Sequence, residues 1–183
     1  MPEPISSAAF RESLAQFASG VTVITATTSA GLVGFTATAF TSVSLEPPLV
    51  LVCIAKTASA HDAVVAADEV GVSVLAESQA WIAEQFAQRG IDRFGGVPLR
   101  ETGGSEPPLV DGALVQLVGR PHTRSIVGDH TLLVLEITHA AIAPGKPLLH
   151  FSRKFGGFAA ESLPRESTPP RSVAREPNAG GGV

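Results

Sequence analysis

The stretch from Gly34 to His61 constrains the fold more than any other part of this chain. It reads GFTATAFTSVSLEPPLVLVCIAKTASAH: an alternating segment, a Pro-Pro pair, an apolar run and a polar turn. Because proline cannot donate a ladder hydrogen bond, Pro47 and Pro48 separate two strands. The pattern predicts an extended segment over Gly34–Leu45, a strand buried on both faces over Leu49–Ile54, and a helix capped by Ser59 or Thr57.

The alternating segment predicts a binding face. In an extended chain successive side chains point to opposite sides. One face then carries Thr36, Thr38, Phe40, Ser42 and Ser44, and the other carries mainly small apolar side chains. The turn after the second strand adds Lys56 and Ser59 near a helix start, an arrangement that suits an anion such as phosphate. A flat ring with a phosphate is the outline of a flavin nucleotide.

The rest of the chain is mainly strand-like with short helices, an α+β pattern. This order favours a small β-barrel with helical additions over a parallel sheet. A loop rich in Gly and Pro is expected over Gly90–Asp111. The expected helices are Ser6–Ala18, Ser59–Ala67 and Ser78–Gln88, and the further strands are Val21–Thr27, Leu32–Phe40, Val70–Leu75, Ala113–Gly119, Thr123–Val127, Thr131–His139 and Leu148–Ser152.

Four aromatic side chains are expected in the core: Phe10, Phe17, Trp81 and Phe86. Each lies in a segment with helical spacing of apolar residues, which is more typical of packing than of cofactor stacking. The single cysteine, Cys53, lies in an apolar run and is expected to be a buried structural thiol.

Composition predicts one globular domain over residues 1–158, followed by a flexible tail over residues 159–183 that is rich in Pro and Gly. The net charge of −4 gives no electrostatic footprint for nucleic acid. We expect no signal peptide and no membrane span. One cysteine excludes an intrachain disulfide framework and fits a cytoplasmic location.

Several common catalytic motifs are missing from the sequence. There is no GxGxxG, GxxxxGK[ST], GxSxG or HExxH pattern, so any nucleotide is expected on a scaffold other than the Rossmann or P-loop folds. The five histidines lack the short spacing of metal ligands, and no metal site is expected.

Five segments together resemble the flavin reductase-like family, the reductase components of two-component flavin-dependent monooxygenases. They occur in the family's order and cover about residues 6–158. The segments are FRESLAQFASGVTVITA (Phe10–Ala26), GFTATAFTSVSLEPPLVLV (Gly34–Val52), KTAS (Lys56–Ser59), FAQRGIDRFGGV (Phe86–Val97) and GDHTLLVLEI (Gly128–Ile137).

The resemblance implies an FMN-binding split β-barrel of Greek-key type that works as a homodimer. Members of the family oxidise NADH or NADPH and pass the hydride to FMN or FAD. The reduced flavin then diffuses to a separate oxygenase component.

The resemblance also implies which residues contact the nucleotides. In the family, the strand matching Thr36 to Phe40 lies along the flavin ring, and the histidine of the GDH motif, here His130, lies near the nicotinamide. Many relatives carry a hydroxyl where this chain has Ala39, and Tyr where it has Phe155. The implied cofactor-binding residues are Thr36, Ala37, Thr38, Ala39, Phe40, Ser42, Cys53, Ala55, Lys56, Ser59, His130 and Phe155, and His130 is also the catalytic candidate.

Two other functions fit the residues: a flavin-binding redox sensor or carrier without turnover, and a split-barrel oxidase or reductase that retains its flavin. The choices between FMN and FAD, and between NADH and NADPH, stay open. A 2′-phosphate requires an arginine, and the candidates are Arg11, Arg93, Arg120, Arg124 and Arg153.

Overall fold

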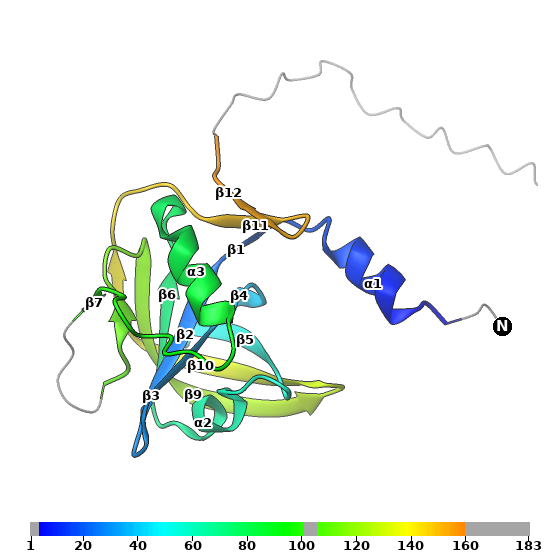
Figure 1. Cartoon of the computed structure of the whole chain (residues 1–183). Helices are drawn as coiled ribbons and strands as arrows, with labels where there is room; N and C mark the ends of the chain where they lie inside the picture. Colours follow the sequence, from blue (N-terminus) through cyan, green and yellow to red (C-terminus); the bar gives the residue numbers. More distant parts are fainter. Residues whose placement is uncertain (1–3, 101–105, 160–183) are drawn as a thin grey trace, which may run out of the picture.

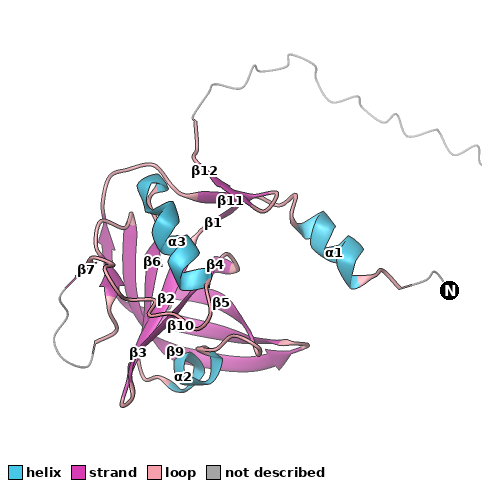
Figure 2. Ribbon diagram, viewed as in Figure 1, coloured by secondary structure: helices cyan, strands magenta, loops and turns pink. Residues whose placement is uncertain are grey.

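The structure is a computed structural model that describes residues 4–100 and 106–159. The predicted tail beyond residue 159 lies outside the described residues. Figures 1 and 2 show a curled sheet with α3 and α2 packed against it, and α1 standing away from it. The elements are α1 (Ser7–Leu14), β1 (Ser19–Gly20), β2 (Thr22–Thr28), β3 (Gly31–Ala37), β4 (Phe40–Ser44), β5 (Leu49–Ala55), α2 (His61–Ala66), β6 (Val70–Val74), a 3₁₀ turn (Glu77–Gln79), α3 (Ala80–Ala87), β7 (Leu99–Arg100), β8 (Leu109–Val110), β9 (Val115–Val127), β10 (His130–Ile142), β11 (Leu149–Phe151) and β12 (Lys154–Gly156).

Seven antiparallel strands form the main sheet, in the order β3-β2-β6-β9-β10-β5-β4. Its two edge strands, β3 and β4, are consecutive in the chain and are joined by Thr38 and Ala39 alone. Two residues can join opposite edges only if the sheet curls round on itself. The amide of Cys53 on β5 donates to the carbonyl of Ala39, at 3.0 Å, and fastens this junction. The predicted fold class, mainly β with short helices, is confirmed.

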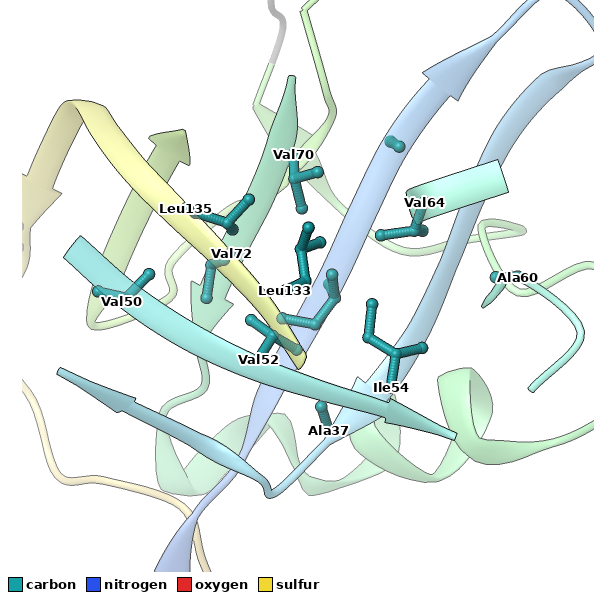
Figure 3. Packing of buried hydrophobic residues seen from close by; sticks show 12 residues of the cluster. Ala37, Val50, Val52, Ile54, Ala60, Val64, Val70, Val72, Leu133 and Leu135 are labelled. Atoms are coloured by element: carbon teal, nitrogen blue, oxygen red, sulfur yellow. The ribbon is translucent and has the colours of Figure 1, made fainter. Parts of the chain in front are cut away.

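Two clusters of apolar side chains fill the fold. The first lies inside the curled sheet, where Val52 and Ile54 of β5 meet Leu133 of β10 and Val64 of α2 (Figure 3). The second lies beneath α3, where Phe86 and Ile82 pack against Val21 and Leu148. Phe86 is fully buried, so its predicted core position is confirmed.

Three strand predictions were wrong. Gly34–Leu45 is two strands rather than one, because the chain bends at Thr38 and Ala39. The strand after Pro48 is buried on one face only, and its other side chains are partly exposed. The two strands predicted over Ala113–Gly119 and Thr123–Val127 are one strand, β9.

The helices also differ from the predictions. α1 ends at Leu14, and Phe10 and Phe17 are 51% and 75% exposed rather than buried. Trp81 on α3 is 45% exposed, because this helix buries the face that carries Ile82 and Phe86. α2 begins at His61, after Ala60, and no side chain in the described part of the chain caps it.

Part of the predicted long loop has regular structure, since β7 and β8 pair with each other within Gly90–Asp111. In the described ranges, no helix is long and apolar enough to cross a membrane.

Candidate functional site

The outward face of the β5–β10 pair brings several predicted site residues into one row. In the register, Cys53 pairs with Leu132, and Ala55 pairs with His130. Directly paired residues point to the same side of a sheet, and the side alternates along each strand. Val52 and Leu133 point into the core, so Cys53, Ala55 and His130 all lie on the opposite, partly exposed face.

A pocket of about 510 Å³ opens on this face. Its floor includes Leu51 and Cys53 of β5, and one wall is the bend between β3 and β4. The end of α1 and the turn after β11 form further walls. The size is in the range of small-molecule sites. The lining residues are Arg11, Leu14, Ala15, Phe17, Ser19, Thr38, Ala39, Phe40, Thr41, Leu51, Cys53, His150 and Arg153.

The backbone at the β3–β4 bend has hydrogen-bond donors to spare. Among the described residues, the amide groups of Thr38 and Ala39 donate to no acceptor, since neither residue lies in a ladder. Both residues are exposed and line the pocket. Two spare N–H groups beside an apolar floor match the carbonyl-rimmed edge and the flat face of a flavin ring. The residues present therefore fit a flavin.

Four other residues of the β3–β4 segment that were predicted to contact flavin have surroundings different from those of Thr38 and Ala39. The hydroxyl of Thr36 donates to the carbonyl of Ala83 at 2.6 Å, so it anchors α3. Ala37 is buried in the core. Phe40 lines the pocket and also packs against the first cluster. Ser42 pairs with the buried Val50 and lies on the opposite face of β4 from Thr41, so it lies outside the pocket lining.

The predicted phosphate turn lies just beyond β5. The Lys56 ammonium group donates to the carbonyl of Gly128 at 2.9 Å, and the Lys56 backbone amide donates to the backbone carbonyl of Asp129. Ser59 lines a separate pocket of about 260 Å³, together with Arg93 and Phe94. Lys56 and Ser59 both lie outside the lining of the larger pocket.

His130 begins β10 at the turn after Gly128. Its Nδ1 atom lies 2.7 Å from Oδ1 of Asp129. This hydrogen bond lowers the pKa of Asp129, so the carboxyl group is ionised at neutral pH. An ionised carboxylate can only accept a hydrogen bond, so Nδ1 carries the proton. Nε2 of His130 has no partner among the described residues, which leaves it available to a ligand.

Phe155 lies outside the pocket lining, but it contacts His150, which belongs to the lining. It pairs with His150 across the β11–β12 hairpin, with ring centroids 5.6 Å apart. Phe155 packs against the second core cluster, and His150 lines the pocket.

Cys53 is a partly exposed free thiol on the pocket floor rather than a fully buried one. Burial raises the pKa of this thiol, so it is protonated at neutral pH.

Sequence reasoning missed several pocket residues. Thr41 and Leu51 belong to the predicted strands, but the bend at Thr38 changes which side chains of β4 share a face with β5. His150, Arg11 and Arg153 come from segments far apart in the chain, and no motif connected them. Among the described residues, no group of three or more His, Cys, Asp or Glu side chains is placed to hold a metal ion.

Comparison with known proteins assigns the family. The flavin reductase like domain family matches residues 14–159. The chain belongs to the flavin reductase-like family. A curated relative of this family, the FMN reductase (NADH) SmoA of Agrobacterium fabrum, is 36% identical over 161 residues, which cover 88% of this chain and 91% of that protein. The NADH:riboflavin 5′-phosphate oxidoreductase of Streptomyces pristinaespiralis is 44% identical over 153 residues, with coverage of 80% and 85%.

Solved structures of flavin reductases have the same fold. The NADH:FAD oxidoreductase SgcE6 of Streptomyces globisporus, in complex with NAD and FAD fragments, superposes with a TM-score of 0.82 at 35% identity, covering 89% of this chain and 99% of that one. The styrene monooxygenase flavin reductase of Pseudomonas putida gives a TM-score of 0.75 at 30% identity, with coverage of 84% and 99%. The predicted split barrel is thereby confirmed.

Proposed function

We propose that this protein is an NAD(P)H-dependent flavin reductase, which oxidises NADH or NADPH and reduces FMN or FAD. The observation that carries the proposal is the shared outward face of β5 and β10, where the pocket floor at Cys53 and the side chain of His130 lie in one row. Membership of the flavin reductase-like family supports it. The reduced flavin leaves the protein and serves a separate monooxygenase component. A relative from Rhodococcus opacus is named as the reductase component of a 4-nitrophenol 4-monooxygenase, which supports this partner.

The chain's own residues position two nucleotides. The bound nucleotides supply the chemistry, a hydride transfer from nicotinamide to flavin, which requires no protein acid or base. The amides of Thr38 and Ala39 donate to the flavin edge, and Leu51 and Cys53 support its flat face.

The remaining implied contacts are placed around that ring. Lys56 and Ser59 provide a cation and a hydroxyl for the flavin phosphate. His130 holds the nicotinamide amide or a phosphate oxygen through Nε2, because Asp129 fixes Nδ1 as the bonded donor. Thr36, Ala37, Phe40 and Phe155 shape the surrounding structure instead of touching the ring through polar atoms.

A homodimer is part of the proposal, and α1 is its support. This helix stands clear of the sheet (Figure 1). Its apolar side chains Phe10 and Leu14, and Phe17 just beyond it, are all more than half exposed. A second copy of the chain covers this apolar stripe, and it also closes the pocket side formed by Leu14 and Phe17. A charge placed on the stripe, Phe10→Glu, should yield a monomer in light scattering, whereas Glu12→Ala should leave the dimer intact. A wild-type monomer at micromolar concentration contradicts the dimer.

We also propose a cytoplasmic location, which the single free thiol of Cys53 supports.

Steady-state oxidation of NADH and NADPH, each with added FMN and FAD, tests the function. We expect turnover with at least one of the four pairs and release of flavin on gel filtration. No turnover with any pair would contradict the enzyme function and favour a flavin sensor or carrier. Turnover with flavin retained throughout purification would indicate an oxidase or reductase that keeps its flavin.

A further inference from the structure

The turn between β11 and β12 holds two residues in left-handed backbone. Ser152 has φ 48° and Arg153 has φ 62°, and neither is glycine. Side chains with a Cβ are disfavoured in this region, and such strain persists only where the surrounding structure imposes it. Here β11 pairs with β1, and the amide of Ser152 donates to the carbonyl of Ala15 at 2.8 Å. The turn is therefore fixed against the end of α1.

This turn places a second arginine in the lining of the large pocket. Arg153 comes from the turn, and Arg11 comes from α1, one helical turn before Ala15. No described residue of the lining carries a carboxylate, although the whole chain has a net charge of −4. The pocket is thus locally cationic in an otherwise acidic protein, which attracts an anionic ligand.

Each of the other candidate arginines already uses two of its three guanidinium nitrogen atoms within the chain. Arg93 donates to the carbonyl of Gly34, Arg120 pairs with Glu69, and Arg124 donates to the carbonyl of Val65. By contrast, no hydrogen bond or ion pair joins the side chain of Arg153 to any described residue.

Arg11 is also largely available to a ligand. Its Nε donates to the carbonyl of Ser7 at 3.2 Å, and its two Nη groups have no partner in the described ranges. Two guanidinium groups with spare donors in one pocket lining supply the charge and the donors that a phosphate group requires.

We propose that Arg153, assisted by Arg11, binds a phosphate group of the dinucleotide hydride donor. This inference rests on the proposed function. The flavin phosphate has its own turn at Lys56 and Ser59, and neither residue lines this pocket. Hydride transfer needs two nucleotides bound together, and the chain offers two separate cationic places. The phosphate is either the pyrophosphate, common to NADH and NADPH, or the 2′-phosphate of NADPH.

Arg153→Ala tests the proposal through binding as well as turnover. We expect the Kd for NAD⁺ or NADP⁺, measured by calorimetry in the absence of turnover, to rise about tenfold or more with the loss of a charged hydrogen bond. The KM for the matching reduced donor should rise in parallel. Arg153→Lys keeps the charge and should recover part of the affinity. The matched control is Lys154→Ala, which removes a neighbouring cation that lies outside the pocket lining, and it should change neither constant.

Arg153→Gly separates binding from backbone strain. Glycine is free at positive φ, so this variant should melt about 2–4 °C higher than wild type. It should nevertheless lose donor affinity as Arg153→Ala does. A merely structural arginine would show no such combination of gained stability and lost affinity.

The two donors distinguish the two phosphates. Equal losses for NAD⁺ and NADP⁺ identify the pyrophosphate, and a loss confined to NADP⁺ identifies the 2′-phosphate. Unchanged Kd values for both donors would overturn the proposal. So would a loss of affinity for FAD alone. A loss of donor affinity that accompanies dissociation of the dimer, as seen by light scattering, would also overturn it. If Arg153→Ala binds donors normally and still reduces flavin, the inference fails while the function stands. If wild type binds donors through Arg153 without reducing flavin, the function fails alone.

Discussion

The side chains of His130 and Cys53 lie on the same face of the β5–β10 pair. Cys53 pairs with Leu132, which is two residues after His130 on β10. Cys53 lies on β5 and His130 on β10, so the two form a diagonal pair across adjacent strands. Diagonal same-face neighbours are about 7–8 Å apart, a distance that one nucleotide ring can span. A flavin over Cys53 therefore has His130 beside it rather than across the sheet. This relationship connects the flavin segment with a histidine about eighty positions further along the chain.

Removal of the His130 imidazole should weaken donor binding more than flavin binding. We expect His130→Ala to raise the KM for NADH or NADPH about five- to tenfold, because one hydrogen bond at Nε2 is lost. The Kd for flavin, measured by fluorescence quenching, should change little. His139→Ala is the matched control, since His139 is an exposed histidine further along β10. An unchanged KM for the donor would reject this role of His130.

The thiol of Cys53 reports both burial and flavin binding. Because burial raises its pKa above the ordinary 9.0, alkylation by iodoacetamide should be slower in the folded protein than in urea between pH 7 and about 9. The raised pKa also means that folding stability falls as the pH rises above 9.0, where the unfolded chain releases its thiol proton first.

Flavin should slow this alkylation further, since the proposed ring covers Cys53 on the pocket floor. Mass spectrometry gives the rate directly, because Cys53 is the single cysteine of the chain. Equal alkylation rates with and without saturating FMN or FAD would contradict the placement of the flavin ring over Cys53.

Substitutions at two threonines separate the structural role of the β3–β4 segment from its role in flavin binding. Thr36→Val removes the 2.6 Å bond to Ala83 and should lower the free energy of unfolding by about 1 kcal/mol, with little effect on flavin affinity. Thr41→Val, on the pocket lining, should leave stability within about 0.5 kcal/mol and weaken flavin binding about fivefold. Urea titration and flavin fluorescence measure the two quantities. The reverse pattern would place the flavin on the Thr36 side of β3.

Strands β3 and β4 were predicted as one strand because nothing in the sequence marks their junction. Thr38 and Ala39 continue the alternation of the flanking residues, and neither is Gly or Pro. The bend follows from curling of the sheet, a tertiary constraint that local patterns do not contain. It turns Thr41 toward the pocket in place of Ser42.

The error at β9 was the opposite one, because a single strand that contains Pro121 was predicted as two strands. A proline ordinarily ends a strand, but here the register shifts so that His122 is an extra residue between Pro121 and Thr123. The pairing of β6 with β9 ends at Gly119, so on that side the proline faces no ladder.

The β5 strand, the Pro-Pro break and the position of His130 after a tight turn were predicted from local patterns, because each depends on neighbouring residues. The apolar stripe of α1 was also found, but the prediction that it is buried was wrong, since Phe10 and Phe17 are 51% and 75% exposed. Arg11 and Arg153 share one pocket lining because β1 pairs with β11 and the end of α1 is hydrogen-bonded to the turn after β11, and no spacing rule in the sequence connects them.

Close packing around Gly34 supports the wall of the smaller pocket. A Cβ on Gly34 would lie 2.8 Å from the Phe86 ring and 2.9 Å from the carbonyl of Ile24. Gly34→Ala should therefore lower the free energy of unfolding by about 1–3 kcal/mol in urea titration. Gly20→Ala, whose added methyl group has no described residue within 4 Å apart from its chain neighbours, should stay within about 0.5 kcal/mol of wild type. Equal stability of the two variants would mean that the Phe86 ring yields freely.

Anaerobic mixing of the purified protein with flavin and a nicotinamide donor tests the central claim most directly. The visible absorbance of oxidised FMN or FAD is followed after addition of NADH or NADPH. We predict a decay that the wild-type protein accelerates over the protein-free mixture, that His130→Ala slows at low donor concentration, and that His139→Ala leaves unchanged. No acceleration with any of the four pairs would contradict a flavin reductase.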